Sequence, residues 1–108
     1  MAKFQLSQDE TIIGSGMMAY KHRKSPASQP TRGTIYVTNQ RVCYHESWSN
    51  YVYMDLPLSD VEGYAAKRAL FVTFVHIYSR DNKVYSFSGF PAKNLQVWLE
   101  QTGVRKLS

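Results

Sequence analysis

The sequence contains one cysteine, Cys43, among its 108 residues. A lone cysteine cannot form an internal disulfide, so the fold must rest on its hydrophobic core, as is usual in a reducing compartment. No apolar stretch approaches the roughly 20 residues that a membrane-spanning helix needs. The opening Met-Ala-Lys-Phe also lacks the apolar run of a signal peptide. We therefore expect a cytoplasmic protein whose contact with membranes is peripheral.

Patterns of catalytic and metal-binding residues are equally scarce. The three histidines are scattered, and a site formed by Cys43, His45 and His76 would lack the paired Cys or His spacings that usually mark a metal site. The segment Gly14-Ser15-Gly16 is followed by no helical pattern, so it is not a nucleophile elbow, and it lacks the length and the lysine of a phosphate-cradling loop. We predict a chain with no enzymatic activity, no bound metal and no cofactor.

Acidic residues are absent from one long segment. The net charge is +5, and no aspartate or glutamate occurs between Thr11 and His45. The cations of this segment are Lys21, Arg23, Lys24, Arg32 and Arg41, whereas the other eight basic and eight acidic residues of the chain cancel. Lys21 to Arg32 contains two prolines and small polar residues, which favours a basic loop that could dock an anion. Basic loops also serve solubility alone, and the sequence leaves both interpretations open.

What is present is a β-rich pattern. A chain of 108 residues suits one domain, which we place over residues 1–108, with a single core that removes roughly two thirds of the unfolded surface from water. Ile35 and Val37 share one face of a strand, and Val42 and Tyr44 share a face of the next. This alternation predicts an antiparallel hairpin. Its turn falls at Asn39-Gln40, where asparagine tolerates a positive φ.

Turn residues recur at the spacing of an all-β domain. Besides the hairpin, we predict strands at 11–21, 51–58, 61–68, 70–78 and 84–88, which makes about seven in all. In the strand at 51–58, the side chains expected to point inward are Val52, Met54, Leu56 and Leu58, and those expected to point outward are Tyr51, Tyr53 and Asp55. Gly14 and Gly16 within the first strand indicate a bulge or a sharp coil of the sheet.

The chain changes period near its end. From Pro91 to Thr102, the apolar residues Leu95, Trp98 and Leu99 follow the spacing of one helical stripe. Proline suits the first turn of a helix, and Gly103 suits its end. Burial of each such side chain contributes about 1.5–3 kcal/mol, so this helix should pack on the open end of a curled β-structure.

The hairpin also carries a pattern that resembles a known family. Gly33-x-Ile35-Tyr36-Val37-Thr38-x-x-Arg41-Val42-x-Tyr44 resembles the signature of GRAM domains and of their relative, the GLUE domain of an ESCRT-II endosomal-sorting subunit. Seven strands followed by one helix is the order of the pleckstrin-homology (PH) superfold. The resemblance implies a mainly β, PH-like fold, in which seven-stranded curled antiparallel sheets form a partly open barrel capped by one C-terminal α-helix.

The resemblance further implies a non-catalytic binding module. GLUE domains bind phosphoinositides through basic residues near the first loop and in the loop between the fifth and sixth strands, which here contains Lys67-Arg68. We therefore expect a basic rim that binds a phosphoinositide or an anionic membrane, formed by Lys21, Arg23, Lys24, Arg32, Lys67 and Arg68. The implied setting is membrane trafficking or endosomal sorting, with the protein peripheral at a membrane such as that of the endosome.

Two alternatives stay open. PH-like scaffolds also bind peptides, ubiquitin or neighbouring subunits, and the contact residues would then be Trp48, Tyr51 and Tyr53, with a protein partner or the remainder of a larger protein as the ligand. The opposing interpretation is that Trp48 closes a loop and both tyrosines cover the sheet. Binding of single-stranded nucleic acid is disfavoured, because the aromatic residues in 71–74 alternate faces and no second helix is predicted.

Overall fold

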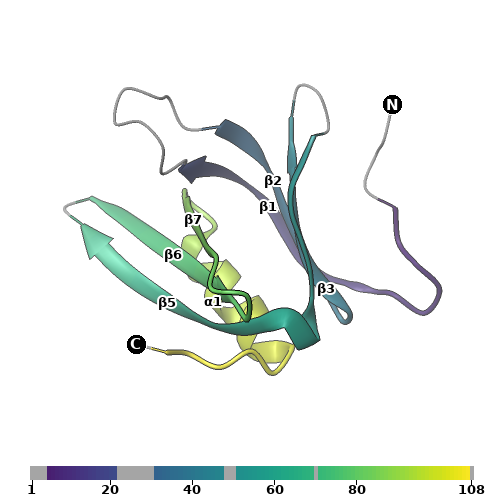
Figure 1. Ribbon diagram of the computed structural model, residues 1–108. Helices are drawn as coiled ribbons and strands as arrows, with labels where there is room; N and C mark the ends of the chain where they lie inside the picture. The colour runs from purple at the N-terminus through teal and green to yellow at the C-terminus, as the bar shows by residue number, and fades with distance from the viewer. Residues whose placement is uncertain (1–4, 22–30, 48–50, 70, 108) are drawn as a thin grey trace.

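One antiparallel sheet and one helix make up the fold. A computed structural model describes residues 5–21, 31–47, 51–69 and 71–107. The elements are β1 (Ile12–Lys21), β2 (Thr31–Thr38), β3 (Arg41–Glu46), β4 (Val52–Pro57), a 3-10 turn η1 (Leu58–Asp60), β5 (Val61–Ala69), β6 (Val72–Ser79), β7 (Val84–Ser88) and α1 (Ala92–Gln101) (Figure 1). Seven strands and a C-terminal helix confirm the predicted mainly β architecture.

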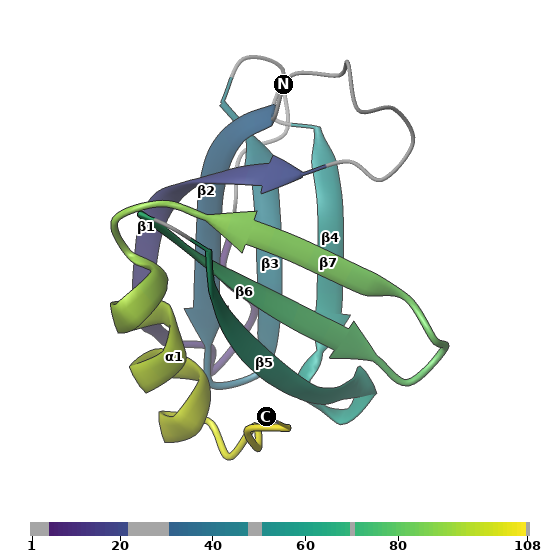
Figure 2. The same cartoon turned by 90° about the vertical axis from the view of Figure 1, so that its left-hand side faces the viewer.

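The sheet curls around its own core. Its strand order is β4-β3-β2-β1-β7-β6-β5, and β4 and β5 are its two edges. Figure 2 shows β5, β6 and β7 crossing in front of β2, β3 and β4, with α1 beside the crossing. The apolar side chains between the two halves form one cluster, to which α1 contributes Leu95 and Leu99. The partly open barrel is therefore built from one continuous sheet rather than from separate sheets.

The predicted hairpin is confirmed, but its turn works differently from the prediction. Ile35 faces Tyr44 and Val37 faces Val42 across β2 and β3, and all four side chains are fully buried. Asn39 does not have the positive φ that was expected of it. Among the described non-glycine residues, a positive φ occurs at Asp9 and Asn82. Instead, the Thr38 hydroxyl oxygen closes the turn. It accepts hydrogen bonds from the backbone N–H groups of Gln40 and Arg41, at 3.1 and 3.0 Å.

The predicted alternation along β4 breaks at a β-bulge. Tyr44 pairs with Met54, but the next residue of β3, His45, pairs with Val52. One extra residue reverses the facing of the side chains that follow it. Val52 is consequently exposed, and Tyr53 packs inward with its ring 5.3 Å from that of Tyr20. The expected inward Val52 and outward Tyr53 are therefore both wrong.

The helix is positioned by a close approach to β1. It begins after Pro91 and ends before Gly103, whose φ of +90° is the conformation expected of a helix-ending glycine. A Cβ atom on Gly14 would lie 2.1 Å from the Trp98 indole, so only glycine lets the indole rest on the strand. The register of β1 against β2 also shifts between Ile12 and Gly14. The first glycine thus marks an irregularity of the strand, as predicted, and also a contact with α1.

The edge at β5 is partly covered by the last described residues. The Tyr64 backbone N–H donates to the Arg105 carbonyl at 3.0 Å, and the Leu107 N–H donates to the Tyr64 carbonyl at 2.6 Å. Because an unpaired edge attracts other strands, this segment protects the sheet at that point.

Candidate functional site

Four residues of the predicted basic rim have a described backbone, and they lie on β1, β2 and β5. Arg32 lies exposed on β2, and Lys67 and Arg68 lie exposed on β5. The backbone of Lys21 ends β1 opposite Ser86 of β7. The Lys21 side chain, together with Arg23 and Lys24, lies outside the part of the chain that the structure describes, so their placement in the rim stays a prediction.

Arg32 and Lys67 occupy one row of the sheet. Lys67 pairs with Phe74, Phe74 with Ser88, Ser88 with Ala19, and Ala19 with Arg32. Directly paired residues of antiparallel strands point to the same face, so both cations project from the outer face of the sheet. Four strand spacings of about 4.8 Å separate their Cα atoms by roughly 19 Å along the sheet. The two cations therefore lie in one row of the outer face without being neighbours.

Lys67 and Arg68 belong to strand β5 and not to the loop after it. Neighbouring residues of a strand point to opposite faces, so Arg68, which pairs with Thr73, does not reinforce Lys67 on the outer face. The charge of Lys67 affects His76 instead. The pKa of His76 is lowered mainly by burial and, to a smaller extent, by the positive charge of this lysine. The Nδ1 atom of His76 lies 2.7 Å from the Ser86 hydroxyl. The sequence-based picture of one Lys-Arg cluster in a loop is therefore wrong.

A cluster of exposed apolar side chains lies next to this row. Phe71 is 97% exposed and Phe90 is fully exposed, and Met17 and Val72 are also exposed. We call these four residues the apolar corner. Phe71 and Val72 at the start of β6 line one hollow together with Phe90, which lies in the connection from β7 to α1. Sequence reasoning missed this corner, because strand periodicity does not report residues in turns and strand ends.

Two hollows flank Phe90 within the apolar corner. One has a volume of about 440 Å³ and is lined by Met17, Met18, Ala19, Arg32, Val72, Ser88, Gly89 and Phe90. The other has a volume of about 370 Å³ and is lined by Phe71, Val72, Thr73, Gly89, Phe90, Ala92 and Lys93. Each hollow therefore combines an exposed phenylalanine with one cation, Arg32 in the first and Lys93 in the second.

Carboxylates lie away from this surface. All eight acidic residues of the chain are in its described part, and none of them lines either hollow. The ion pairs are Arg41 with Glu10 and Asp55, Lys83 with Asp81, and Arg105 with Glu62. In the regions that the structure describes, no carboxylate lies within ion-pair distance of Arg32, Lys67, Arg68 or Lys93. These four cations thus keep their charge for an external anion.

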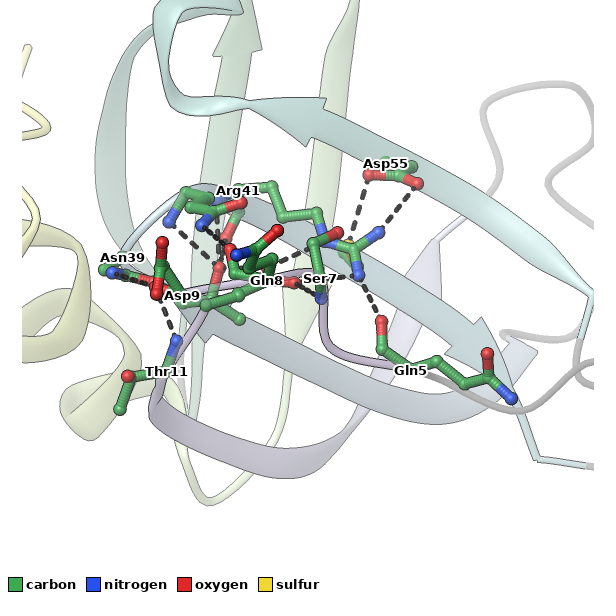
Figure 3. Close-up of polar contacts among 12 residues, drawn as sticks. Gln5, Ser7, Gln8, Asp9, Thr11, Asn39, Arg41 and Asp55 are labelled. Atoms are coloured by element: carbon green, nitrogen blue, oxygen red, sulfur yellow. Dashed lines mark hydrogen bonds and ion pairs between the residues drawn. The ribbon is translucent and has the colours of Figure 1, made fainter.

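Arg41, the fifth cation of the acid-free segment, is already engaged. Figure 3 shows its guanidinium reaching Asp55 and the carbonyl of Gln5. Its Nε donates to the Glu10 carboxylate at 2.8 Å, and its Nη1 donates to Asp55 at 3.3 Å. The positive charge that the sequence assigns to this position is therefore neutralised, and Arg41 is a structural residue rather than an anion-binding one.

Glu10 is the centre of that network. It also accepts hydrogen bonds from the Thr38 hydroxyl at 2.5 Å and from the Ser7 backbone N–H at 2.8 Å. These contacts lower the pKa of Glu10 from 4.5 to about 2, chiefly through the hydrogen bond from Arg41 and against the effect of burial. Asn39 fixes the same segment, since its amide accepts from the Thr11 N–H at 2.8 Å. The network holds the residues before β1 against the turn of the hairpin.

Cys43 is not a reactive site. Its side chain is fully buried, and its Sγ–H donates to Asp55 at 3.3 Å. Burial, followed by the hydrogen bond to this carboxylate, raises the pKa of Cys43 from 9.0 to about 12. The fraction of Cys43 ionised to the reactive thiolate at neutral pH is therefore far smaller than that of an ordinary cysteine.

A thiol reagent should therefore label Cys43 slowly in the native protein and rapidly in urea, as mass spectrometry over time would measure. Native labelling as fast as that of the unfolded chain would contradict the burial of this thiol.

The alternative aromatic site is only partly formed. Tyr51 is 60% exposed, whereas Tyr53 packs against the core. Their rings contact each other edge to face at a centroid distance of 4.8 Å. Trp48 lies outside the described residues. Tyr53 therefore belongs to the margin of the core, and Tyr51 is the exposed aromatic of this site among the described residues.

Metal and membrane-spanning sites have no counterpart in the residues described. There, no three His, Cys, Asp or Glu side chains gather as metal ligands would. In the same residues, no helix has the length and apolar character needed to cross a bilayer.

The comparisons with known proteins place this architecture. The structure matches the C-terminal domain of an unknown protein from Leishmania infantum with a TM-score of 0.72 and 12% identity over 88% of this chain and 86% of that one. It matches the Vps36 N-terminal PH domain with a TM-score of 0.68 and 19% identity, over 91% and 80% of the two chains. The hSac2 domain of the human phosphoinositide phosphatase Sac2 follows with a TM-score of 0.54 and 16% identity, over 94% and 77%. These likenesses confirm the PH-like fold.

Sequence comparison adds the family. A search of curated protein sequences found no significant match. The family model of the GRAM domain matches residues 1–100. GRAM domains are PH-like modules that generally bind membranes or lipids and are typically non-catalytic. Because the match spans most of the chain, this chain belongs to the GRAM-domain family.

Proposed function

We propose that this chain binds peripherally to the anionic surface of a membrane, membranes that contain phosphoinositides included. The proposed contact residues are Lys21, Arg23, Lys24, Arg32 and Lys67 of the basic rim, without Arg68, which points to the opposite face of β5. One observation carries the proposal. Arg32 and Lys67 project from the same row of the outer face, and in the described part of the chain neither is paired with a carboxylate.

The spacing of these cations favours a surface over a single headgroup. A separation of roughly 19 Å along the sheet is wider than one inositol phosphate, so Arg32 and Lys67 would contact different lipids. Each cation near an anionic leaflet contributes about 1 kcal/mol, and this contribution falls with added salt. Several such contacts give affinities in the micromolar range at best. We therefore expect reversible binding that depends on the charge of the membrane.

Neutralising the two described cations of the row tests this function. The variant with Arg32→Gln and Lys67→Gln should bind vesicles of equimolar phosphatidylcholine and phosphatidylserine about 30-fold more weakly, because two contacts of about 1 kcal/mol are lost. Vesicle sedimentation at low and physiological salt measures the change. The matched control is Lys83→Gln with Arg105→Gln, which removes the same charge from cations that pair with carboxylates elsewhere.

Three outcomes would contradict the proposal. The first is equal binding by the two double variants, and the second is equal binding to neutral and anionic vesicles. The third is that binding saturates on vesicles with a small fraction of one phosphoinositide but not on vesicles with phosphatidylserine. That result would indicate a pocket specific for one headgroup instead of a charged surface. If amide NMR shifts on adding a protein partner centred on Tyr51, the protein-binding alternative would be favoured instead.

A further inference from the structure

We propose that Phe71 and Phe90 insert into the interfacial layer of an anionic bilayer, so that the apolar corner is the part of the protein that enters the membrane. Arg32 and Lys93 would then contact the lipid headgroups on either side of the inserted rings. This inference rests on the proposed function and extends it, because basic residues alone would hold the protein on the surface without insertion.

The exposure of the two rings is the first argument. An aromatic side chain contributes to folding by leaving water, yet Phe71 is 97% exposed and Phe90 is fully exposed. Single exposed apolar residues are normal on a protein surface, but a contiguous exposed group usually marks a binding site. Met17 and Val72, both exposed, line the hollows beside these rings. The group is therefore contiguous rather than scattered.

The backbone holds one of these rings outward. Gly89 has a φ of +147°, a conformation that residues with a side chain rarely adopt, and it immediately precedes Phe90. It lies beside β1, since an added Cβ would be in van der Waals contact with the Met17 carbonyl oxygen and the Met18 Cα at 3.5 Å. The Ala92 N–H donates to the Gly89 carbonyl at 3.1 Å, which closes the turn into α1. The protein thus presents Phe90 on a defined turn between β7 and α1.

Charge indicates what covers the apolar corner. A purely apolar protein partner would gain nothing from cations at its border. Here Arg32 lines the hollow that contains Met17, and Lys93 lines the hollow that contains Phe71. No acidic side chain of the chain lines either one. Apolar aromatic rings between cations complement an anionic bilayer, whose headgroups carry negative charge above an apolar layer.

The test combines loss of the rings with a probe of depth. The variant with Phe71→Ser and Phe90→Ser should bind vesicles of equimolar phosphatidylcholine and phosphatidylserine on the order of 100-fold more weakly, since each buried ring accounts for about a tenfold change. The matched control is Val97→Ser, because Val97 is 48% exposed on α1 and lines neither hollow. Both variants should keep the thermal midpoint of the parent protein, because neither change touches the buried core.

A fluorescent label at position 71 reports insertion directly. Phe71→Cys would be labelled with an environment-sensitive dye, while the buried Cys43 stays unlabelled in the native protein. On the same vesicles, its emission should shift to the blue and be quenched by nitroxides on the lipid chains. The same label on Lys83→Cys, at the far ends of β6 and β7, should show neither effect.

The outcomes separate the two proposals. If the double serine variant binds as the parent does and the label at position 71 stays in water, insertion is overturned, and charge-dependent surface binding stands. If the parent protein binds no vesicle of any composition, the proposed function itself fails. If the rings matter equally for neutral and anionic vesicles, the assignment of Arg32 and Lys93 to headgroups is overturned.

Discussion

Replacing Gly33 with alanine is expected to lower the free energy of unfolding by about 3–5 kcal/mol, as overpacking of a closely packed interior does at its upper range. An alanine Cβ at this position would lie 2.2 Å from the His45 carbonyl oxygen and 2.9 Å from the Cζ atom of Tyr44. The first contact is with the backbone, so no change of rotamer relieves it. Strand β3 would have to move away from β2, and the pairing of Gly33 with Glu46 would be lost.

The shift would also disturb a buried hydrogen bond. The Tyr44 hydroxyl lies 2.8 Å from the Met18 carbonyl and 2.9 Å from the Thr31 carbonyl, to which it donates. If the new methyl group displaced the Tyr44 ring, the two carbonyls would lose this hydrogen-bond donor. An unsatisfied buried polar group costs about 1–3 kcal/mol. Part of the expected destabilisation therefore comes from β1 as well as from the hairpin.

Urea denaturation followed by circular dichroism measures the effect. The matched control is Thr34→Ala, next in sequence on the opposite face of β2, where the side chain is only partly buried. We expect this control to change the free energy of unfolding by less than about 1 kcal/mol, in the usual range for surface positions. If the two variants had similar free energies of unfolding, β3 would be able to move away from β2 without loss of stability. That result would contradict the tight packing of Gly33 against β3.

Gly33 shows which structural features strand periodicity predicts and which it does not. Alternation of Ile35, Val37, Val42 and Tyr44 predicted the hairpin correctly, because strand periodicity of two is a direct consequence of backbone geometry. The same pattern reports Gly33 only as a glycine. That its missing side chain makes room for a carbonyl of the neighbouring strand depends on the separation of two strands, which no local pattern encodes. For the same reason, the approach of Trp98 to Gly14 was not foreseen.

The missed features share a physical origin. A single inserted residue in β4 reversed the facing of Val52 and Tyr53, and a bulge leaves no mark in hydrophobic alternation. Phe71 and Phe90 lie in a turn and a connection, where neither a period of two nor one of 3.6 applies. Arg32 and Lys67, 35 positions apart, share a row only because five strands pair in a particular register. Candidate sites built from long-range register therefore required the structure.

For Arg41, the sequence gives the positive charge but not the carboxylates that neutralise it in the fold. The sequence separates it by 31 positions from Glu10, so the acid-free segment looks more basic than it is. In the fold, Glu10 reaches Arg41 because Asn39 and Thr38 fix the residues before β1 on the turn. The basic surface consequently begins at Arg32 and extends toward β5, not toward the turn of the hairpin.

Replacing Glu10 with glutamine is expected to lower the free energy of unfolding by roughly 3 kcal/mol at neutral pH, which is the equivalent of a pKa lowered from 4.5 to about 2. The carboxylate side chain is fully buried, and removal of one member of a buried ion pair leaves the other charge uncompensated. Asp55, 3.3 Å from the Arg41 guanidinium and far more exposed, would replace only part of the lost interaction. The matched control is Glu62→Gln, since Glu62 forms an exposed pair with Arg105 at 3.7 Å. Exposed pairs contribute about 0–1 kcal/mol, so this control should be nearly neutral.

The dependence on pH gives this prediction its sharpest form. The pKa of Glu10 is lower in the folded state than in the unfolded state, so its contribution is complete above pH 4.5 and is lost as the pH falls toward 2. The parent protein should therefore lose stability over that interval, as urea titrations at a series of pH values would show. The Glu10→Gln variant lacks the titrating group, so its stability should fall less steeply over the same interval and approach that of the parent near pH 2. Parallel curves for the two proteins would show that another carboxylate is responsible for the acid limb. The Glu10–Arg41 pair would then be a contact without energetic weight, and the hydrogen bonds of Asn39 and Gln40 would hold the residues before β1.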